Sequence, residues 1–244
     1  MHTRSQDVAA WVRSRVMAAG AAGVAVPLRG TIESAVVARL SQLAMPDRVL
    51  GVILRGDAAD ADGGEAAVLA GYLQLPAVTI DMPAAGVFSN LDTAVASVPR
   101  GSRDNSDGPG RRADLGERLR MAALYFVAES MNYLTAGTLD RTDLILGTFA
   151  RYGGEAVDVL PLGSVLRSEV LALAKDLQLP PALGESAIAA DEARRGTVGV
   201  SHHHLEQYLA EGPDAVAPAV ALKIERLMRE SERKRRAAAV PEGD

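Results

Sequence analysis

Three almost uninterrupted apolar runs in the first third of the chain restrict its fold more than any other feature. These runs cover residues 24–26, 48–54 and 77–82. The segments between and before them carry apolar side chains at helical spacing, over residues 8–18, 31–43 and 65–73. Continuously apolar strands that alternate with helices are typical of a parallel sheet covered on both faces. We therefore expect an α/β protein with a mostly parallel, doubly wound sheet.

Composition narrows the range of partners. The 244 residues include 26 Lys and Arg against 31 Asp and Glu, a net charge of −5, which favours neither nucleic acid nor an anionic membrane as a partner. No apolar run approaches the roughly 20 residues that a membrane span needs. The absence of cysteine excludes disulfides, thiolate metal sites and a cysteine nucleophile. We therefore expect a cytoplasmic protein that binds no nucleic acid and no membrane.

Two segments depart from the strand and helix alternation. Residues 99–113 are rich in Gly, Pro, Ser, Asp and Asn, which predicts a mobile loop. This loop is either a solvated insertion or a lid whose four arginines close over an anionic ligand. The second segment is a C-terminal helical extension at 201–244, in which Ser201 is expected to cap a surface helix.

A candidate site lies where the first predicted strand ends. Ligands in open parallel sheets bind beyond the carboxyl ends of the strands. Residues 28–34 lead from the first strand through Gly30 directly into a helix. Such a turn is either an anion cradle, with backbone amides and the helix dipole directed at the ligand, or an ordinary strand-to-helix connection.

Longer motifs support the first interpretation. Residues 23–40 read GVAVPLRGTIESAVVARL, which resembles the pyrophosphate loop of ammonia-dependent NAD synthetases, SGGxDS followed by a helix. Further matches follow in the order found in that family: RLRM at 118–121, AGT at 136–138, FARYGGEAVDVLPL at 149–162 and ERKRR at 232–236. The resemblance extends over nearly the whole chain.

The resemblance implies a fold and an activity. It implies one domain over residues 1–244, with a doubly wound five-stranded sheet of the adenine nucleotide alpha hydrolase type, working as a homodimer. Members of this family use ATP and Mg²⁺ to adenylate the carboxylate of nicotinic acid adenine dinucleotide, and ammonia then displaces AMP to give the amide of NAD. Because the chain has no cysteine nucleophile to release ammonia from glutamine, its nitrogen would be free ammonia or would come from a separate protein.

The resemblance also assigns roles to ten residues. The ATP-binding positions are Gly30, Ser34, Thr138 and Arg167. The positions that hold the acid substrate are Arg118, Arg151, Asp158 and Lys234. The two magnesium acids fall on Glu33 and Asp143, where the family has Asp and Glu respectively, so the two carboxylates exchange length but keep their charge.

The pyrophosphate loop departs most from the family pattern. Arg29 and Thr31 place side chains where a phosphate usually needs close approach to bare backbone. Three interpretations stay open at this point. The chain is an NAD synthetase-like ligase with altered nucleotide contacts, a similar ligase that acts on a different carboxylate, or a catalytically impaired homologue that binds a nucleotide or a partner protein.

Overall fold

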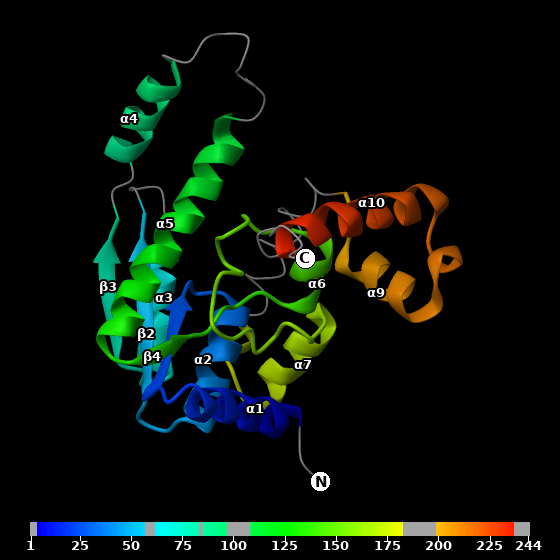
Figure 1. Ribbon diagram of the computed structural model, residues 1–244. Coiled ribbons are helices and arrows are strands. Elements are labelled where there is room, and N and C mark those ends of the chain that lie inside the picture. Colours follow the sequence, from blue (N-terminus) through cyan, green and yellow to red (C-terminus); the bar gives the residue numbers. More distant parts are fainter. Residues whose placement is uncertain (1–3, 57–61, 83–84, 97–107, 183–198, 237–244) are drawn as a thin grey trace, which may run out of the picture.

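The computed structural model describes residues 4–56, 62–82, 85–96, 108–182 and 199–236 of the chain (Figure 1). The strands are β1 (Gly23–Leu28), β2 (Val49–Arg55), β3 (Ala77–Asp81) and β4 (Tyr133–Thr135). The helices are α1 (Arg4–Ala18), α2 (Ile32–Ala44), α3 (Asp62–Tyr72), α4 (Ala85–Ala96), α5 (Gly108–Ser130), α6 (Arg141–Leu146), α7 (Arg167–Asp176), α9 (His202–Glu211), the 3-10 helix η2 (Pro213–Ala215) and α10 (Pro218–Arg235).

The sheet confirms the α/β class. Its strands follow the order β3-β2-β1-β4, and every neighbouring pair is parallel. Along β1, Val24, Val26 and Leu28 join the core on one face, whereas Ala25 joins the core on the other face. Both faces of this strand are buried, which explains why its sequence is continuously apolar.

The expected strand count of five is wrong for the described part of the chain, where the sheet has four strands. Beside β4, the segment 157–160 contributes only one isolated parallel bridge, between Ala136 and Val159. Backbone bonds flank this bridge, from the Val159 amide to the Thr135 carbonyl oxygen at 3.1 Å and from the Gly137 amide to the Val159 carbonyl oxygen at 2.9 Å, and side-chain bonds take up the neighbouring positions. The Thr135 amide donates to Asp158 Oδ2 at 2.7 Å, and the Asp158 amide donates to Thr135 Oγ1 at 3.0 Å. Because these groups are used locally, the pairing stops after one residue.

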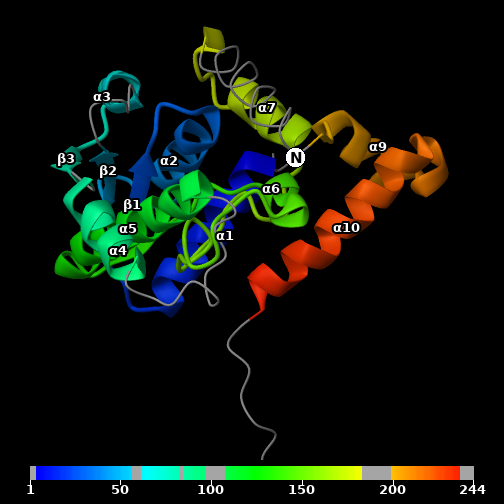
Figure 2. The ribbon, with the colours of Figure 1, turned by 90° about the horizontal axis from the view of Figure 1, so that it is seen from above.

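Helices cover the two faces of the sheet unequally. Helices α2 and α3 pack on one face, with α1 and α7 lying against α2, and their core includes the fully buried Val12, Leu40 and Leu69. Helix α5 covers the other face through Met121 and Leu124. Figure 2 shows the sheet between α2 and α5. Each fully buried leucine contributes about 2 kcal/mol through removal of its surface from water.

Helix α5 begins earlier than the sequence predicts. Residues 99–107 of the expected loop lie outside the described residues, but residues 108–113 already form the first turns of α5. Pro109 lies in the first turn of the helix, where its missing amide proton is tolerated. Because this stretch is polar, it lacks the apolar stripe from which a helix is predicted.

No helix in the described ranges combines the length and the apolar character needed to cross a bilayer.

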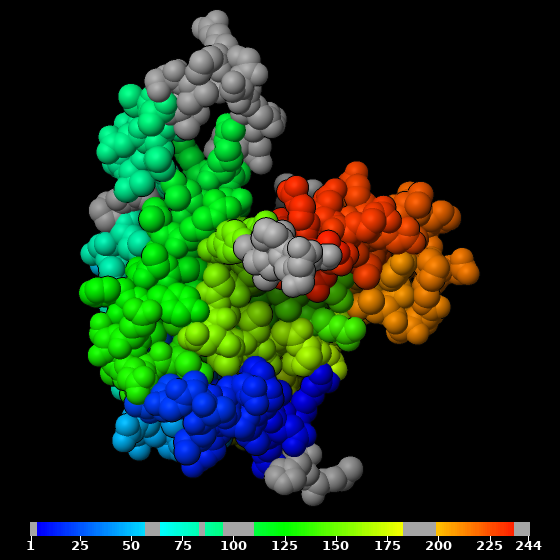
Figure 3. All heavy atoms as spheres, viewed as in Figure 1, coloured from blue at the N-terminus to red at the C-terminus, as the bar shows by residue number. Residues whose placement is uncertain are grey.

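The C-terminal helices form a small separate layer. Helices α9 and α10 pack with α6 around Leu146, Val200, Leu205 and Ile224. As predicted, Ser201 caps α9, with its side chain accepting a hydrogen bond from the His204 amide at 3.2 Å. Figure 3 shows this layer projecting from the side of the molecule. The basic end of α10 returns toward the carboxyl edge of the sheet, which brings it to the site described next.

Candidate active site

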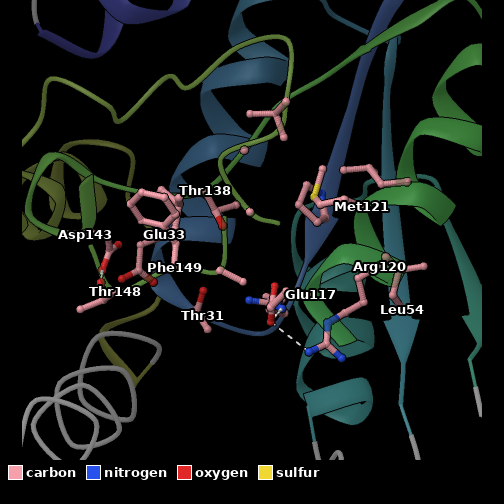
Figure 4. A pocket seen from close by; sticks show the side chains of 18 of the residues that line it. Thr31, Glu33, Leu54, Glu117, Arg120, Met121, Thr138, Asp143, Thr148 and Phe149 are labelled. Carbon is pink, nitrogen blue, oxygen red and sulfur yellow. Dashed lines mark hydrogen bonds and ion pairs between the residues drawn. The ribbon is translucent and has the colours of Figure 1, made fainter. Parts of the chain in front are cut away.

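A cavity of about 490 Å³ opens beyond the carboxyl ends of β1 and β2. Its walls come from the turn after β1, from α5, from the segment after β4, and from the ends of α6, α7 and α10. Figure 4 shows two polar sides of this pocket, one with Glu33 and Asp143 and the other with Glu117 and Arg120. The position agrees with the expectation that ligands of such sheets bind where the parallel strands end.

The first polar side, called here the acidic wall, consists of Glu33, Asp143 and Arg167, with Asp140 behind them. Arg167 forms an ion pair with Glu33, and its Nη1 lies 4.0 Å from Asp140 Oδ2. The Arg167 side chain is only 3% exposed, and Asp140 is completely buried. A buried guanidinium needs close carboxylates to offset its loss of hydration, so this arrangement fixes Arg167 in the wall.

Helix capping explains the placement of the two aspartates. Asp140 is the N-cap of α6 and accepts from the Asp143 amide at 2.9 Å. Asp143 accepts in return from the Asp140 amide at 3.3 Å and from Thr148 Oγ at 2.8 Å. This reciprocal capping box holds the Asp143 carboxylate at the cavity while satisfying helix amides that would otherwise lack partners.

The acidic wall fits a magnesium ion that is shared with a phosphorylated ligand. Glu33 and Asp143 supply hard carboxylate oxygens on one side of the cavity. Among the described residues, no group of three or more acidic, histidine or cysteine side chains converges on a metal position. Magnesium commonly binds through one or two carboxylates, with phosphate oxygens and water as its other ligands. Two acids therefore suit a site that is completed by a substrate phosphate.

Lys234 brings α10 to the cavity. Its Nζ donates to the carbonyl oxygens of Gly147 at 2.6 Å and Phe149 at 2.9 Å, and it lies 5.4 Å from the centre of the Phe149 ring. Lys234 therefore fixes the loop after α6 and places a positive charge on the cavity lining. Thr138, which follows β4, also lines the cavity.

The structure thus brings five of the ten predicted site residues onto one cavity: Glu33, Thr138, Asp143, Arg167 and Lys234. Gly30 and Ser34 instead shape the turn that forms part of the wall. Gly30 has a φ of 70°, and a Cβ atom there would lie 2.5 Å from Glu65 Cβ, so only glycine fits. Ser34 is fully buried, and its Oγ donates to the Thr31 carbonyl oxygen at 2.8 Å.

The other three predicted residues do not line this cavity. Arg118 donates from Nε to the Arg151 carbonyl oxygen at 2.9 Å, and its guanidinium lies 3.5 Å from the cavity residue Asp114. Arg151 donates to the Arg236 carbonyl oxygen at 3.1 Å. Asp158 binds the end of β4, as described above, through Thr135. Arg118 and Arg151 are therefore coupled to each other next to the cavity, whereas Asp158 organises the strand end.

The second polar side, called here the arginine wall, consists of Arg29, Glu117 and Arg120, all of which line the cavity. Arg29 Nη2 lies 2.6 Å from Glu117 Oε1, and Arg120 Nη2 lies 2.9 Å from the same oxygen. Burial alone would raise the pKa of Glu117, but the two guanidinium groups outweigh it and hold this pKa below its ordinary value of 4.5. Glu117 is therefore ionised at neutral pH.

Analysis of the sequence missed Glu117 and Arg120 as candidate site residues. Arg120 is the second arginine of the RLRM motif at 118–121, so the motif contained a signal for it. Glu117 directly precedes that motif and had no signal of its own. Asp140 was also missed, although Asp140 and Asp143 have the spacing of a capping box.

Comparison with known proteins identifies one family over nearly the whole chain. The sequence model of the NAD synthase family matches residues 4–238. An NH3-dependent NAD+ synthetase of Carboxydothermus hydrogenoformans is 32% identical over 98% of this chain and 96% of its own. A second, from Alkaliphilus oremlandii, is 33% identical over 94% of this chain and 92% of its own.

Solved structures show the same fold. An NMN synthetase from Francisella tularensis superposes with a TM-score of 0.78 at 23% identity and covers 98% of this chain and 97% of its own. The NH3-dependent NAD synthetase of Campylobacter jejuni, solved with a nitrate ion, gives a TM-score of 0.75 at 22% identity and covers 98% of both chains. The solved structures show only the fold, whereas the family model and the two sequence relatives identify the family. The chain belongs to the NAD synthase family.

Proposed function

We propose that the chain is an ATP-dependent amide-forming ligase that converts nicotinic acid adenine dinucleotide to NAD with ammonia as the nitrogen donor. The observation that carries the proposal is the convergence of five predicted residues from separate elements on one cavity, in a chain of the NAD synthase family. The relatives named NH3-dependent NAD+ synthetases support the choice of reaction.

The reaction has two steps. The substrate carboxylate attacks the α-phosphorus of ATP, which forms an acyl adenylate and releases pyrophosphate. Ammonia then attacks the acyl carbon, and the bond to the AMP oxygen breaks to leave the amide and AMP. Both steps develop negative charge on phosphate or carbonyl oxygens, which fixed cations and hydrogen-bond donors stabilise.

The residues divide between the two substrates. Arg167, held in place by Glu33 and Asp140, presents a fixed positive charge to the phosphates of ATP, and Thr138 offers a hydroxyl to the same cavity. Lys234 is proposed to contact the acid substrate from α10. Gly30 and Ser34 act by shaping the phosphate-facing turn. Arg118, Arg151 and Asp158 are proposed as more distant substrate contacts.

Magnesium is proposed as the cofactor, held by Glu33 and Asp143 together with phosphate oxygens. When bound, it neutralises phosphate charge and makes pyrophosphate a better leaving group. The protein's own part is to hold these two carboxylates on one side of the cavity and to keep Arg167 between Glu33 and Asp140.

A homodimer and a cytoplasmic location are proposed as well. Helices α4 and α5 extend together away from the body (Figure 1). Val87 and Leu91 of α4 are exposed, and Phe126, near the C-terminal end of α5, is 75% exposed. Exposed large apolar side chains are enriched at interfaces between subunits. Sedimentation velocity should show a dimer for the wild type, and Phe126→Glu should shift it toward the monomer; a wild-type monomer at all concentrations would contradict the proposal.

The direct test of function is an assay with purified protein, ATP, magnesium, ammonium and nicotinic acid adenine dinucleotide. The proposal predicts equal amounts of pyrophosphate, AMP and NAD. Pyrophosphate released only with another carboxylate, such as nicotinic acid mononucleotide, would keep the ligase chemistry and replace the substrate. Nucleotide binding without any pyrophosphate release would favour the catalytically impaired homologue.

A further inference from the structure

In the arginine wall, two guanidinium groups share one carboxylate oxygen. Arg29 and Arg120 share a single carboxylate oxygen of Glu117, at 2.6 Å and 2.9 Å. If Arg29 turns away from Glu117, this carboxylate therefore still has Arg120 as an ion-pair partner. The side chains are partly shielded from water, with exposed fractions of 36% for Arg29 and 27% for each of the other two. Guanidinium groups that line a partly shielded cavity favour an anionic group.

The turn beside Arg29 offers fewer backbone donors than a glycine-rich loop. Thr31 caps α2 with its own side chain, whose Oγ accepts from the Ser34 amide at 3.4 Å. The Arg29 amide in turn is directed at Ser34 Oγ, at 3.4 Å. Amides at a helix N-terminus are the usual donors to a bound phosphate. Since the Ser34 amide of α2 and the Arg29 amide before it are both used within the turn, a side-chain donor would add to the backbone donors that remain for a phosphate.

We propose that Arg29 is a phosphate-binding residue, which exchanges Glu117 for a phosphate group when substrate enters the cavity. Arg120 keeps Glu117 paired after Arg29 leaves, so the exchange does not leave the Glu117 carboxylate without an ion-pair partner. Glu117 serves as a resting counter-ion, and Arg120 as its permanent partner. This inference rests on the proposed ligase function and deepens it, because it identifies a residue where the pyrophosphate loop departs from the family pattern.

The alternative hypothesis from the sequence, that Arg29 merely obstructs the loop, predicts the opposite effect of removing it. Binding of inorganic pyrophosphate, followed by calorimetry, separates the two. Arg29→Ala should weaken binding about tenfold, and Arg29→Lys about threefold, because lysine keeps the charge but loses the planar fork. Unchanged or tighter binding in Arg29→Ala would overturn the proposal.

A matched control is available outside the cavity. Arg4 of α1 forms an ion pair with Glu169 of α7, and these side chains are 46% and 34% exposed. Arg4→Ala therefore removes an ion pair between two elements, as Arg29→Ala does, without touching the arginine wall. Pyrophosphate affinity should stay within twofold of the wild type in Arg4→Ala. Thermal melting of each variant shows whether it is folded, and Arg29→Gln replaces Arg29→Ala if the latter is not.

Glu117→Gln tests the exchange itself. Without the carboxylate, Arg29 no longer has to leave an ionised partner, so pyrophosphate should bind about threefold more tightly than to the wild type. A role of Glu117 in holding Arg29 in its binding position predicts weaker binding instead. That result would overturn the exchange.

Steady-state kinetics identify the source of the phosphate and separate this inference from the proposed function. A rise in the KM of ATP alone in Arg29→Ala assigns the contact to ATP, and a rise in the KM of the dinucleotide alone assigns it to the acid substrate. No rise in either, in an active enzyme, would overturn the inference and leave the ligase intact. If the wild type lacks ligase activity but binds pyrophosphate through Arg29, the proposed function fails and the anion site stands.

Discussion

The two polar walls of the cavity contain opposite proportions of acidic and basic side chains and have different relations to the family pattern. In the acidic wall, Glu33 and Asp140 flank one guanidinium, that of Arg167, and Asp143 is joined to Asp140 by the capping box. In the arginine wall, two guanidinium groups share one carboxylate. The first arrangement suits a cation bound together with phosphates, and the second suits the phosphates themselves.

The comparison shows how a divergent loop is accommodated by its surroundings. The acidic wall keeps the charge of both family acids, although their lengths are exchanged. The arginine wall contains Arg29, where the family has serine, and Glu117 of α5 accommodates it at 2.6 Å. Arg29 is thus paired with a carboxylate 88 positions further along the chain.

The largest expected effect comes from breaking the acidic wall. Glu33→Ala removes the ion-pair partner of Arg167, whose side chain is 3% exposed, and leaves it with Asp140 at 4.0 Å. The free energy of unfolding, measured by urea denaturation, should fall by about 3 kcal/mol. The double variant Glu33→Leu with Arg167→Met should recover most of this loss, since it removes both charges. A loss below about 0.5 kcal/mol in Glu33→Ala would show that the ion pair does not stabilise Arg167.

A smaller effect should follow from Asp143→Asn, which separates metal binding from folding. The asparagine oxygen can still accept from Thr148, but its amide nitrogen cannot accept from the Asp140 amide, so the free energy of unfolding should fall by only about 1 kcal/mol. Pyrophosphate release should fall about 100-fold, and half-maximal activity should need about tenfold more magnesium. The exposed Asp92 of α4, paired with Arg112, provides the control Asp92→Asn. An unchanged magnesium requirement in Asp143→Asn would remove Asp143 from the proposed metal site.

The smallest predicted effect is a pH dependence of stability in the arginine wall. The folded-state pKa of Glu117 lies below its ordinary 4.5, so its ion pairs stabilise the fold above that pH and lose this effect as the pH falls through the folded-state value. Wild type should therefore exceed Glu117→Gln by about 1 kcal/mol at pH 7, with the difference shrinking below pH 4.5. Urea denaturation at pH 7, 5 and 4 measures this. A difference that is constant with pH would contradict the account of the ion pairs.

Much of the fold could be predicted because it depends on local patterns. Continuous apolar runs predicted β1, β2 and β3, and Ser201 predicted the start of α9. The predictions of a fifth strand and of a loop up to residue 113 were wrong, also for local reasons. Side-chain bonds between Asp158 and Thr135 end the ladder, and the first turns of α5 are too polar to show a helical stripe.

The site was predictable only where the family motifs reach the cavity. Glu33, Asp143 and Arg167 were carried over position by position, and all three line it. The pairing of Arg29 with Glu117 depends on how α5 crosses the sheet, which no spacing along the sequence encodes. The departures from the motif could therefore be seen in the sequence, but their compensation could not.

The most direct test of the division between the two walls is a crystal structure of the protein with magnesium and a non-hydrolysable ATP analogue. It should show the metal ion between Glu33 and Asp143, and a phosphate oxygen within hydrogen-bond distance of Arg29, with Glu117 left to Arg120. Electron density that shows Arg29 still paired with Glu117, and no phosphate beside either wall, would contradict the account.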